Sequence, residues 1–306
     1  TKTIRADRLT SLLAQSREIE GQTHPTFRLV GPLDKPEGIT FAGGEVLAEQ
    51  VSLVNPSLPQ RLTAMHGRIL FSQTGGAQFD QVTANVGETQ LQFNGMISGG
   101  TPSVFQDFVI RAKGSAAQLR QMVSAGTFPD DLLYGMVNAK VQLSGPSGAP
   151  HLRGEIGLND AKLVLPMVGE KPLGSPASLE LDADVTRGVG LVISRMELVV
   201  PPLRLPLKGH ITLGDQFSID ASLASGTVSL SSLPEWIYRS GFEAGNLEIS
   251  MDVKGTDAEW RNWRTGGWLA LTNGLMSVKG VDGQVEDIYL RLKFSKNIAD
   301  IKQLSF

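Results

Sequence analysis

The sequence repeats itself in units of about 110 residues, and this periodicity constrains the fold more than any other feature. Residues 44–56 resemble residues 154–166 and, more distantly, residues 267–278. In the same way, residues 135–145 match residues 245–255, with a glycine at both ends of each segment. Self-similarity at a steady period is typical of stacked supersecondary units that share one continuous core. We therefore expect a protein that works through an extended surface and not through a single catalytic pocket.

The repeats predict three units, at residues 1–113, 114–228 and 229–306, in one continuous elongated body. The third unit is truncated, because the strand-like segment 285–294 is followed by only one more such segment. In the second unit, the equivalent segment, residues 177–185, is followed by three. Together with a first residue that is Thr1 and not methionine, this predicts that the chain is a fragment of a longer protein.

Most of the chain alternates apolar and polar residues, which is the pattern of a strand with one buried face. The longest such series takes every second residue from Leu203 to Leu213. The runs are separated by short turns that contain Gly or Pro, among them residues 99–100 and 272–274. Short connections favour antiparallel pairing, and parallel strands would read as continuous apolar runs. The sequence therefore predicts a mainly β protein with a predominantly antiparallel sheet.

Three short segments break the alternation at matching points, at residues 7–18, 115–124 and 232–240. Their apolar residues have helical spacing, each segment starts with Asp or Ser, and a glycine follows the second and the third. The sequence thus predicts one short helix per repeat. Helices of this length are marginal alone, so we expect them to dock against the sheet.

Composition and charge exclude several kinds of protein. The chain has a formal net charge of -3, which gives no electrostatic basis for nucleic-acid binding. It has no cysteine, which excludes structural disulfides and thiolate metal sites, and its histidines lack the spacing of a metal-binding helix. No stretch approaches the roughly 18–20 consecutive apolar residues that span a bilayer. We expect neither a metal nor a cofactor.

Candidate catalytic groups have simpler interpretations. Glu180, Asp182 and Asp184 alternate with apolar residues, which places them on the solvated face of a strand. Ser144 precedes Gly-Pro in a hairpin loop and lacks the strand–elbow–helix setting of a nucleophile. We therefore expect a protein that is not an enzyme. The enzymatic rival is a polysaccharide-active β-solenoid, which needs paired carboxylates and sugar-stacking aromatic residues on one concave face.

A group of tryptophans near the C-terminus has two interpretations. Trp260, Trp263 and Trp268 lie close in sequence to Arg261 and Arg264. The first interpretation is a loop packed on the third predicted helix. The second is an amphipathic contact with lipid headgroups or with a partner protein. The sequence favours the packed loop.

A sheet that is apolar on one face has to bury that face against something. In a sandwich or a closed barrel, the apolar face packs against a second sheet or the opposite wall. In an open, strongly curved sheet, it can pack against a few short helices and an apolar ligand. Leu, Ile and Val dominate the face and aromatic residues are 6% of the chain, which suits acyl chains because no donor or acceptor enters the groove. The same composition suits an ordinary aliphatic core, and patterning alone favours that core.

The repeated glycine–strand frames resemble those of a known family. The frames are residues 141–145 leading to 154–166, then residues 205–211, and the segment 233–237. On these frames the chain resembles the AsmA/TamB-like proteins of Gram-negative envelopes, which belong to the bridge-like lipid-transfer proteins. The resemblance implies a strongly curved antiparallel sheet with an elongated hydrophobic groove on its inner face. It also implies an inner-membrane anchor, a body that crosses the periplasm, and movement of phospholipids toward the outer membrane.

With this resemblance, we expect a periplasmic segment that carries phospholipid acyl chains along an apolar groove between the inner and outer membranes. Its inner-membrane anchor would lie outside this chain, and its partners would be phospholipids and membrane proteins at the ends of the full-length array. The alternative is a non-catalytic structural or adaptor module for outer-membrane assembly, with a filled β core. The family implies no catalytic residues. The expected groove lining is Leu179, Leu181, Leu191, Ile193, Leu205, Leu207, Ile211, Leu213, Phe217, Ile219, Leu247, Ile249 and Met251.

Overall fold

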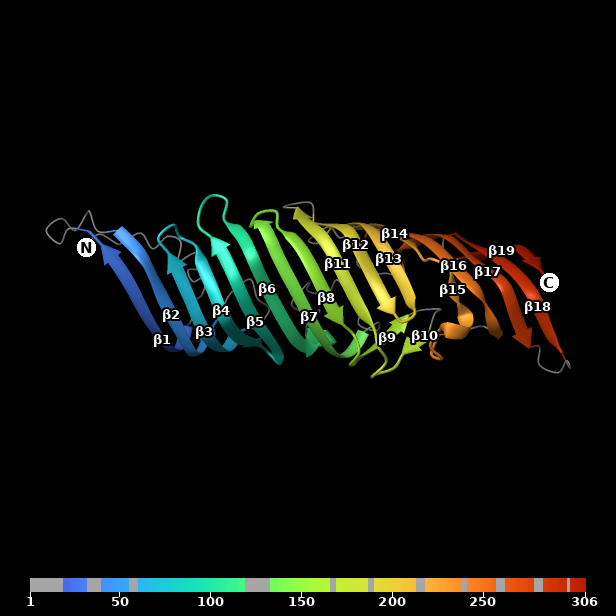
Figure 1. The fold of residues 1–306 in the computed structure, drawn as a ribbon, viewed down its shortest axis with the longest axis horizontal. Coiled ribbons are helices and arrows are strands. Elements are labelled where there is room, and N and C mark those ends of the chain that lie inside the picture. Colours follow the sequence, from blue (N-terminus) through green and yellow to red (C-terminus); the bar gives the residue numbers. More distant parts are fainter. Residues whose placement is uncertain are drawn as a thin grey trace. The chain divides into compact units, whose positions relative to one another are not determined.

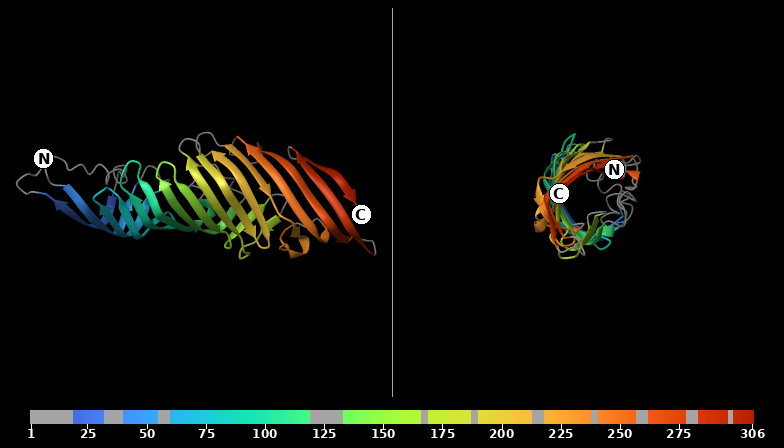
Figure 2. Two further views of the ribbon diagram at one scale, coloured as in Figure 1. Left: turned by 45° about the horizontal axis from the view of Figure 1, so that its top comes forward. Right: turned by 90° about the vertical axis from the view of Figure 1, so that its right-hand side faces the viewer.

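The fold is mainly β, as the alternation predicts. The computed structural model describes residues 19–31, 40–54, 60–118, 133–165, 169–186, 190–212, 218–237, 241–256, 262–277, 283–295 and 298–306. These residues form one large curved antiparallel sheet of 19 strands that is not closed, with almost no helix (Figures 1 and 2). The predicted fold class is confirmed, whereas the groove and the helix in each repeat are not.

The strands follow one another along the sheet in chain order over most of its length (Figure 1). The first nine are β1 (Ile19–Val30), β2 (Thr40–Leu53), β3 (Leu62–Ser72), β4 (Ala77–Val86), β5 (Thr89–Ser98), β6 (Val104–Ser115), β7 (Leu133–Pro146), β8 (His151–Gly157) and β9 (Ala161–Leu165). The others are β10 (Gly169–Lys171), β11 (Ser178–Thr186), β12 (Gly190–Val200), β13 (Leu203–Thr212), β14 (Ser218–Ala224), β15 (Val228–Ser229), β16 (Phe242–Gly255), β17 (Arg264–Ser277), β18 (Gln284–Ser295) and β19 (Ile298–Ser305), with a 3-10 helix, η2 (Leu230–Ser232), between β15 and β16.

The chain divides into two compact units. The first comprises Thr1–Val123 and Asn138–Arg153, and the second comprises Ser124–Val137 and Gly154–Phe306. In the first unit, β1 to β6 form a meander in which each strand pairs antiparallel with the next. In the second unit, β11 to β14 and β16 to β19 form a similar meander, because β14 pairs with β16. The three sequence repeats do not coincide with these two units, and the division into repeats stays a prediction.

Bulges paired with glycines bend the strands of the first unit. Gln50, Gln81 and Asp107 have positive φ angles, and the ladder register shifts beside each of them. A glycine on the neighbouring strand faces each bulge; a Cβ on Gly67, for example, would lie 3.0 Å from the Gln81 carbonyl oxygen. A bulge kinks its strand and increases the local twist. Glycine in these strands therefore lets the bulged backbone of the neighbouring strand come close, which curves the sheet. A side chain at the glycine position would push the bulge away.

The helix predicted over residues 232–240 is wrong for residues 233–237. The 3-10 helix η2 ends at Ser232, and Leu233 already has extended dihedral angles, φ -69° and ψ 145°. The reason is Pro234, because a proline disfavours helical geometry at the residue before it. Of the other two predicted helices, residues 7–18 lie outside the described residues. In the segment 115–124, residues 116–118 are helical and the rest, from 119, lies outside them.

The turn predicted at residues 272–274 is also wrong. Strand β17 continues through these residues, and Gly274 pairs with Ile288 of β18. Asn273 has a φ of 52°, and the register shifts between Leu271 and Gly274. The Asn-Gly pair thus forms a bulge within a long strand. Turns and bulges both use residues that tolerate positive φ, so the same residue types occur in the sequence of either one.

Candidate functional site

The predicted groove residues lie on one face of the second unit. Leu213 and Phe217 are outside the described residues, and the others belong to β11, β12, β13, β14 and β16. Residues directly opposite each other in an antiparallel ladder share a face of the sheet. One row joins Leu181, Met196, Leu207, Leu223 and Met251 across those five strands. The ladder register therefore brings the predicted residues together on a common apolar face.

Further rows run parallel to this one. Leu179 pairs with Leu198, which pairs with Leu205, and Leu191 pairs with Ile211, which pairs with Ile219. Ile193 lies opposite both Ala183 and Gly209. The rows that begin at Leu247 and Ile249 continue to β17 and β18 through Leu271, Leu269, Leu290 and Leu292.

Two residues of this face do not follow the alternation of strand β12. Met196 and Leu198 belong to it, but they are an odd number of residues from Ile193. The register of β12 shifts between Ile193 and Met196. Side chains that are an odd number of residues apart across this shift therefore lie on the same face. Strict alternation cannot detect such a shift, although the apolar character of Met196 and Leu198 is itself a signal.

The apolar face carries no charged side chain in the described parts of β11 to β14 and β16 to β18, where the register assigns its members. Those members are aliphatic residues, glycines, Phe242, Phe294 and Thr265, which lies opposite Val253. Aliphatic side chains offer no hydrogen bond that a ligand would have to satisfy. The face therefore suits apolar ligands that have no polar group along their length.

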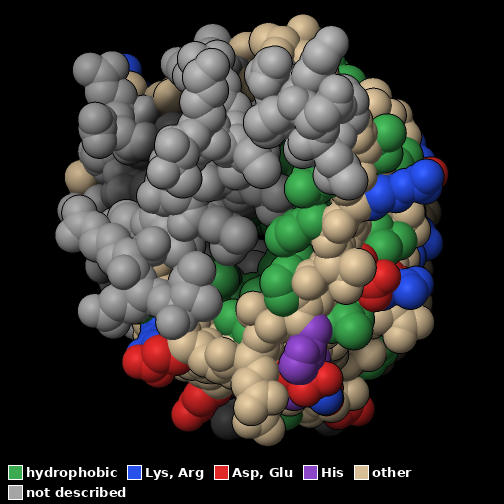
Figure 3. Space-filling view, turned by 90° about the vertical axis from the view of Figure 1, so that its left-hand side faces the viewer, with side chains coloured by type: hydrophobic (Ala, Val, Ile, Leu, Met, Phe, Trp, Pro, Cys, Tyr) green, Lys and Arg blue, Asp and Glu red, His purple; other side chains and the backbone are tan. Residues whose placement is uncertain are grey.

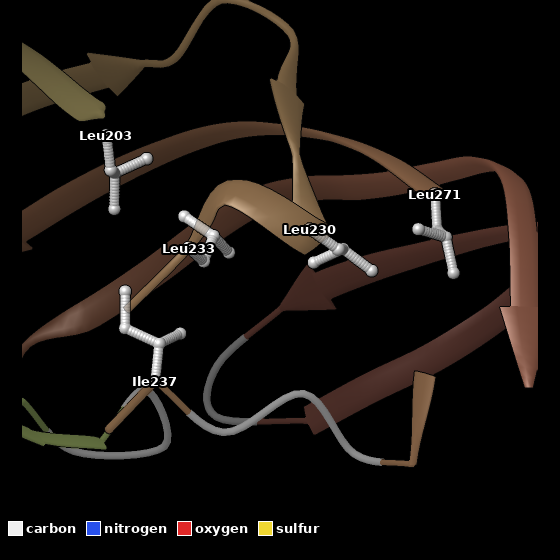
Figure 4. Close-up of a cluster of buried hydrophobic side chains, with 5 residues drawn as sticks. All are labelled: Leu203, Leu230, Leu233, Ile237 and Leu271. Carbon is white, nitrogen blue, oxygen red and sulfur yellow. The ribbon is translucent and has the colours of Figure 1, made fainter. Parts of the chain in front are cut away.

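Part of this face is covered by the chain itself. Residues 230–237, hereafter the strap, lie over it (Figure 4). Three strap side chains, Leu230, Leu233 and Ile237, form a buried cluster with Leu203 of β13 and Leu271 of β17. The predicted groove residues Leu205 and Leu247 pack against this cluster. The strap thus fills the face over Leu203 and Leu271, while Leu205 and Leu247 beside them are half-buried, and the groove stays a prediction.

Other predicted groove residues remain partly accessible. Leu181, Leu207, Ile211 and Met251 are half-buried, and solvent reaches each of them. Ile193 is the exception, since it is 4% exposed. The face therefore has a covered part beneath the strap and a half-buried part over β11 to β14, β16 and β17, in which the row of Ala183, Ile193 and Ala221 is buried.

The first unit has an apolar face of a different composition. One row joins Phe27, Gly44, Phe71, Ala77 and Ile97 across β1 to β5. Viewed from the end where β1 lies, hydrophobic side chains are seen beside the hollow and also on the outer surface, where the visible charged side chains lie (Figure 3). The ring of Phe108 also contacts Phe79 edge-on at 5.3 Å between centroids. Phenylalanine thus contributes here what aliphatic residues contribute in the second unit.

The opposite, polar face of the second unit holds a buried carboxylate. Glu197 of β12 is 6% exposed, and its Oε2 accepts a hydrogen bond of 2.6 Å from Arg195 Nη2. Arg204 lies 3.4 Å from the other carboxylate oxygen, and Glu180 lies 4.0 Å from Arg195. The hydrogen bond from Arg195 lowers the pKa of Glu197 below its ordinary value. Glu180 and Asp182 lie on this same face, opposite Glu197 and Arg195, as the alternation predicts.

The predicted tryptophan cluster is divided between the two faces. Trp263 lies on the apolar side, since its ring occupies the space where a Cβ on Gly255 would be. Trp268 lies on the polar side of β17, opposite Ser250 and Lys293, and the Arg291 guanidinium is 5.4 Å from its ring centroid. Trp260 and Arg261 lie outside the described residues. The two described rings do not form one surface.

A buried lysine has a structural role. Lys171 of β10 is 0% exposed, and its ammonium donates to the carbonyl oxygens of Ala161 at 2.7 Å, Pro172 at 3.0 Å and Asn159 at 3.3 Å. Burial lowers the pKa of Lys171. Because its donors are used by backbone carbonyls, we assign this side chain to holding the β9–β10 hairpin together.

The comparisons with known proteins give no further guide to the site. No protein-family model matches the chain, and no curated protein or solved structure matches it. Within the described residues, there is no group of three or more His, Asp or Glu that could hold a metal. The same residues include no helix that is both long and apolar enough to cross a bilayer. The resemblance to the AsmA/TamB-like family stays a prediction.

Proposed function

We propose that the apolar face of the second unit carries the acyl chains of phospholipids. The observation that supports this most directly is the row of half-buried aliphatic side chains from Leu181 to Met251 on a face without charge. Each CH2 group that leaves water for such a surface gains about 0.8 kcal/mol. A face of this kind favours a long acyl chain over a small polar ligand.

The proposed mechanism needs no cofactor. Neighbouring rows present similar aliphatic side chains, so an acyl chain can move from one row to the next at little change in free energy. A charged headgroup would remain at the rim or in water, because burying it on this face without a partner would be costly. A uniform face has no preferred direction, so the direction of transport would come from other parts of the system.

This proposal includes the cellular context that the sequence resemblance implies. The chain would be a periplasmic segment of a bridge-like lipid-transfer protein, held at the inner membrane by a segment outside it. Its partners would be phospholipids and proteins of the two membranes at the ends of the full-length array. None of these features is needed for the acyl-chain proposal itself, which rests on the apolar face alone.

The alternative is a structural or adaptor module for outer-membrane assembly. One observation favours it: the strap fills the face over Leu203 and Leu271 with the protein's own side chains. A module of this kind would use the apolar face only to stabilise its fold.

Native mass spectrometry followed by lipid extraction tests the proposal. We expect bound phospholipid on the parent chain and its loss in Leu207→Asp, which introduces a charge into the half-buried row. The matched control is Ser222→Asp, which adds the same charge on the polar face of the neighbouring strand, where Ser222 is exposed and lies between Lys208 and Asp252. The control should keep its lipid. A parent chain that stays free of lipid after incubation with phospholipid vesicles would favour the adaptor module.

A further inference from the structure

The strap crosses the apolar face on aliphatic contacts. Leu230 is 6% exposed, Leu233 is 4% exposed and Ile237 is 7% exposed, and all three gather with Leu203 and Leu271 of the sheet (Figure 4). By contrast, Ser231, Ser232 and Glu235 are exposed. The strap is therefore amphipathic, with its apolar side on Leu203 and Leu271 and its polar side in water.

Backbone pairing joins the strap to the sheet at its two ends. Strand β15, just before it, has two residues paired with β16, Val228 with Leu247 and Ser229 with Asn246. At the other end, Ile237 forms an isolated bridge with Gly169 of β10. Within the strap, the amide of Leu233 donates to the Leu230 carbonyl at 3.2 Å. The contacts that hold the strap to the sheet include the packing of Leu230, Leu233 and Ile237 with Leu203 and Leu271.

Glycines flank the strap on both sides. Gly226 precedes β15, and Gly241, with a φ of 85°, precedes β16. A Cβ added at either position would meet no other atom within 4 Å. Hinges in proteins are a few loop or terminal residues that absorb changes in backbone angle, and they are often small. A glycine with open space at its Cβ position therefore lies near each end of the strap.

We propose that the strap is a displaceable cover, which closes the apolar face in the absence of cargo and gives way to a phospholipid acyl chain. This inference rests on the proposed function and adds regulation of the same face. An acyl chain makes the same kind of contact with Leu203 and Leu271 as the strap does, because both surfaces are hydrocarbon. The exchange opens the bridge between Ile237 and Gly169 of β10, whose backbone groups would then bond to water, and the exposed polar side of the strap stays in water.

Cross-linking the strap to the sheet tests the inference. The chain has no cysteine, so Leu203→Cys with Leu233→Cys provides the only two thiols. A short bis-maleimide would pin the strap, and a monofunctional maleimide controls for modification alone. The probe is a phosphatidylethanolamine with an NBD-labelled acyl chain, offered in phosphatidylcholine vesicles. We expect the pinned protein to lose most of the probe binding that the monofunctionally labelled protein keeps.

A second pair controls for cross-linking itself. Thr212→Cys with Ser218→Cys joins β13 to β14 at positions that pair with each other, away from the strap. This cross-link should leave probe binding unchanged. Equal binding by the pinned and monofunctionally labelled Leu203–Leu233 pair would overturn the strap inference and leave the acyl-chain proposal standing.

A variant that loosens the strap avoids dependence on the cysteine pair. Leu233→Ser removes an aliphatic contact from the strap and leaves Leu203 and Leu271 intact, so probe binding should rise above that of the parent chain. Unchanged or lower binding, in a protein that keeps its β circular dichroism, would contradict the inference. If the parent chain itself takes up no probe and Leu233→Ser takes up none, the acyl-chain proposal fails, which is a different result from failure of the strap alone.

Discussion

The covered and half-buried parts of the apolar face differ although their sequences follow the same pattern. Beneath the strap, Leu203 is 5% exposed and Leu271 is 2% exposed. A short distance along the same strands, Leu207 and Leu269 are half-buried. Both parts consist of aliphatic residues on one side of an antiparallel ladder. The difference comes from the strap, which covers one part with Leu230, Leu233 and Ile237.

This comparison shows that a filled core and an open groove need not be exclusive interpretations of the face. Beneath the strap, side-chain packing contributes to stability, so a polar substitution there is costly. In the half-buried part, the backbone ladder holds the strands and solvent already reaches the side chains. The same substitution should therefore have different consequences in the two parts, which the following predictions test.

The largest effect is expected for Leu271→Asp in the covered part. Burying a carboxylate in the cluster without a partner should lower the free energy of unfolding by about 4 kcal/mol or more. Urea denaturation followed by tryptophan fluorescence measures this loss. A Leu271→Asp protein with a parental midpoint would mean that the cluster beneath the strap is not packed.

A backbone substitution in the half-buried part comes second. Gly267 lies opposite Met251 with a φ of 134°, and a Cβ there would collide with the Ser250 carbonyl oxygen. Gly267→Ala should therefore cost about 2–3 kcal/mol of stability. The neighbouring Gly266→Ala is the control, because a Cβ at Gly266 would meet no atom within 4 Å. Equal urea midpoints for the two variants would refute the idea that backbone geometry holds this part together.

A smaller effect is expected for Leu207→Asp. The introduced carboxylate can reach water from a half-buried position, so the loss of stability should be about 1–2 kcal/mol, well below that of Leu271→Asp. Urea titrations of the two variants under the same conditions give the ratio of the two losses of stability. Losses of similar size would indicate that the face over β13 is as fully packed as the face beneath the strap.

The sequence predicts the strands well because their period is local. The segment 177–185 corresponds to β11 at Ser178–Thr186, and the segment 285–294 corresponds to β18 at Gln284–Ser295. Alternation also assigns most of the apolar face, since each strand presents every second residue to one side. These features depend only on neighbours in the chain.

Bulges and the strap could not be predicted in the same way. The bulge at Asn273 uses the residue types of a turn, and the shift before Met196 reverses the alternation without a distinctive signal. The strap depends on contacts between Leu233 and residues far away in sequence, Leu203 and Leu271. Local periodicity contains no information on which distant side chains meet. The sequence therefore predicts the apolar face but not which part of it is covered.

The smallest predicted effect concerns the polar face behind the half-buried part. Because hydrogen bonding from Arg195 lowers the pKa of Glu197 in the folded protein, the folded state binds fewer protons than the unfolded state as the pH falls toward 4.5. The carboxylate thus contributes stability above its unfolded pKa, and this contribution disappears as the pH falls through the folded pKa. Glu197→Gln should be less stable than the parent at pH 7 and should lose less stability on acidification.

Urea titrations at a series of pH values measure this slope, and Glu180→Gln is the control. Glu180 is exposed and lies 4.0 Å from Arg195, compared with 2.6 Å for Glu197, so its substitution should leave the acid slope close to that of the parent. A Glu197→Gln slope as steep as the parental one would mean that the two arginines do not hold this carboxylate. If the slope flattens as expected while lipid binding is unchanged, the polar face contributes to the stability of β11 to β13, and the apolar face behind it can be varied independently.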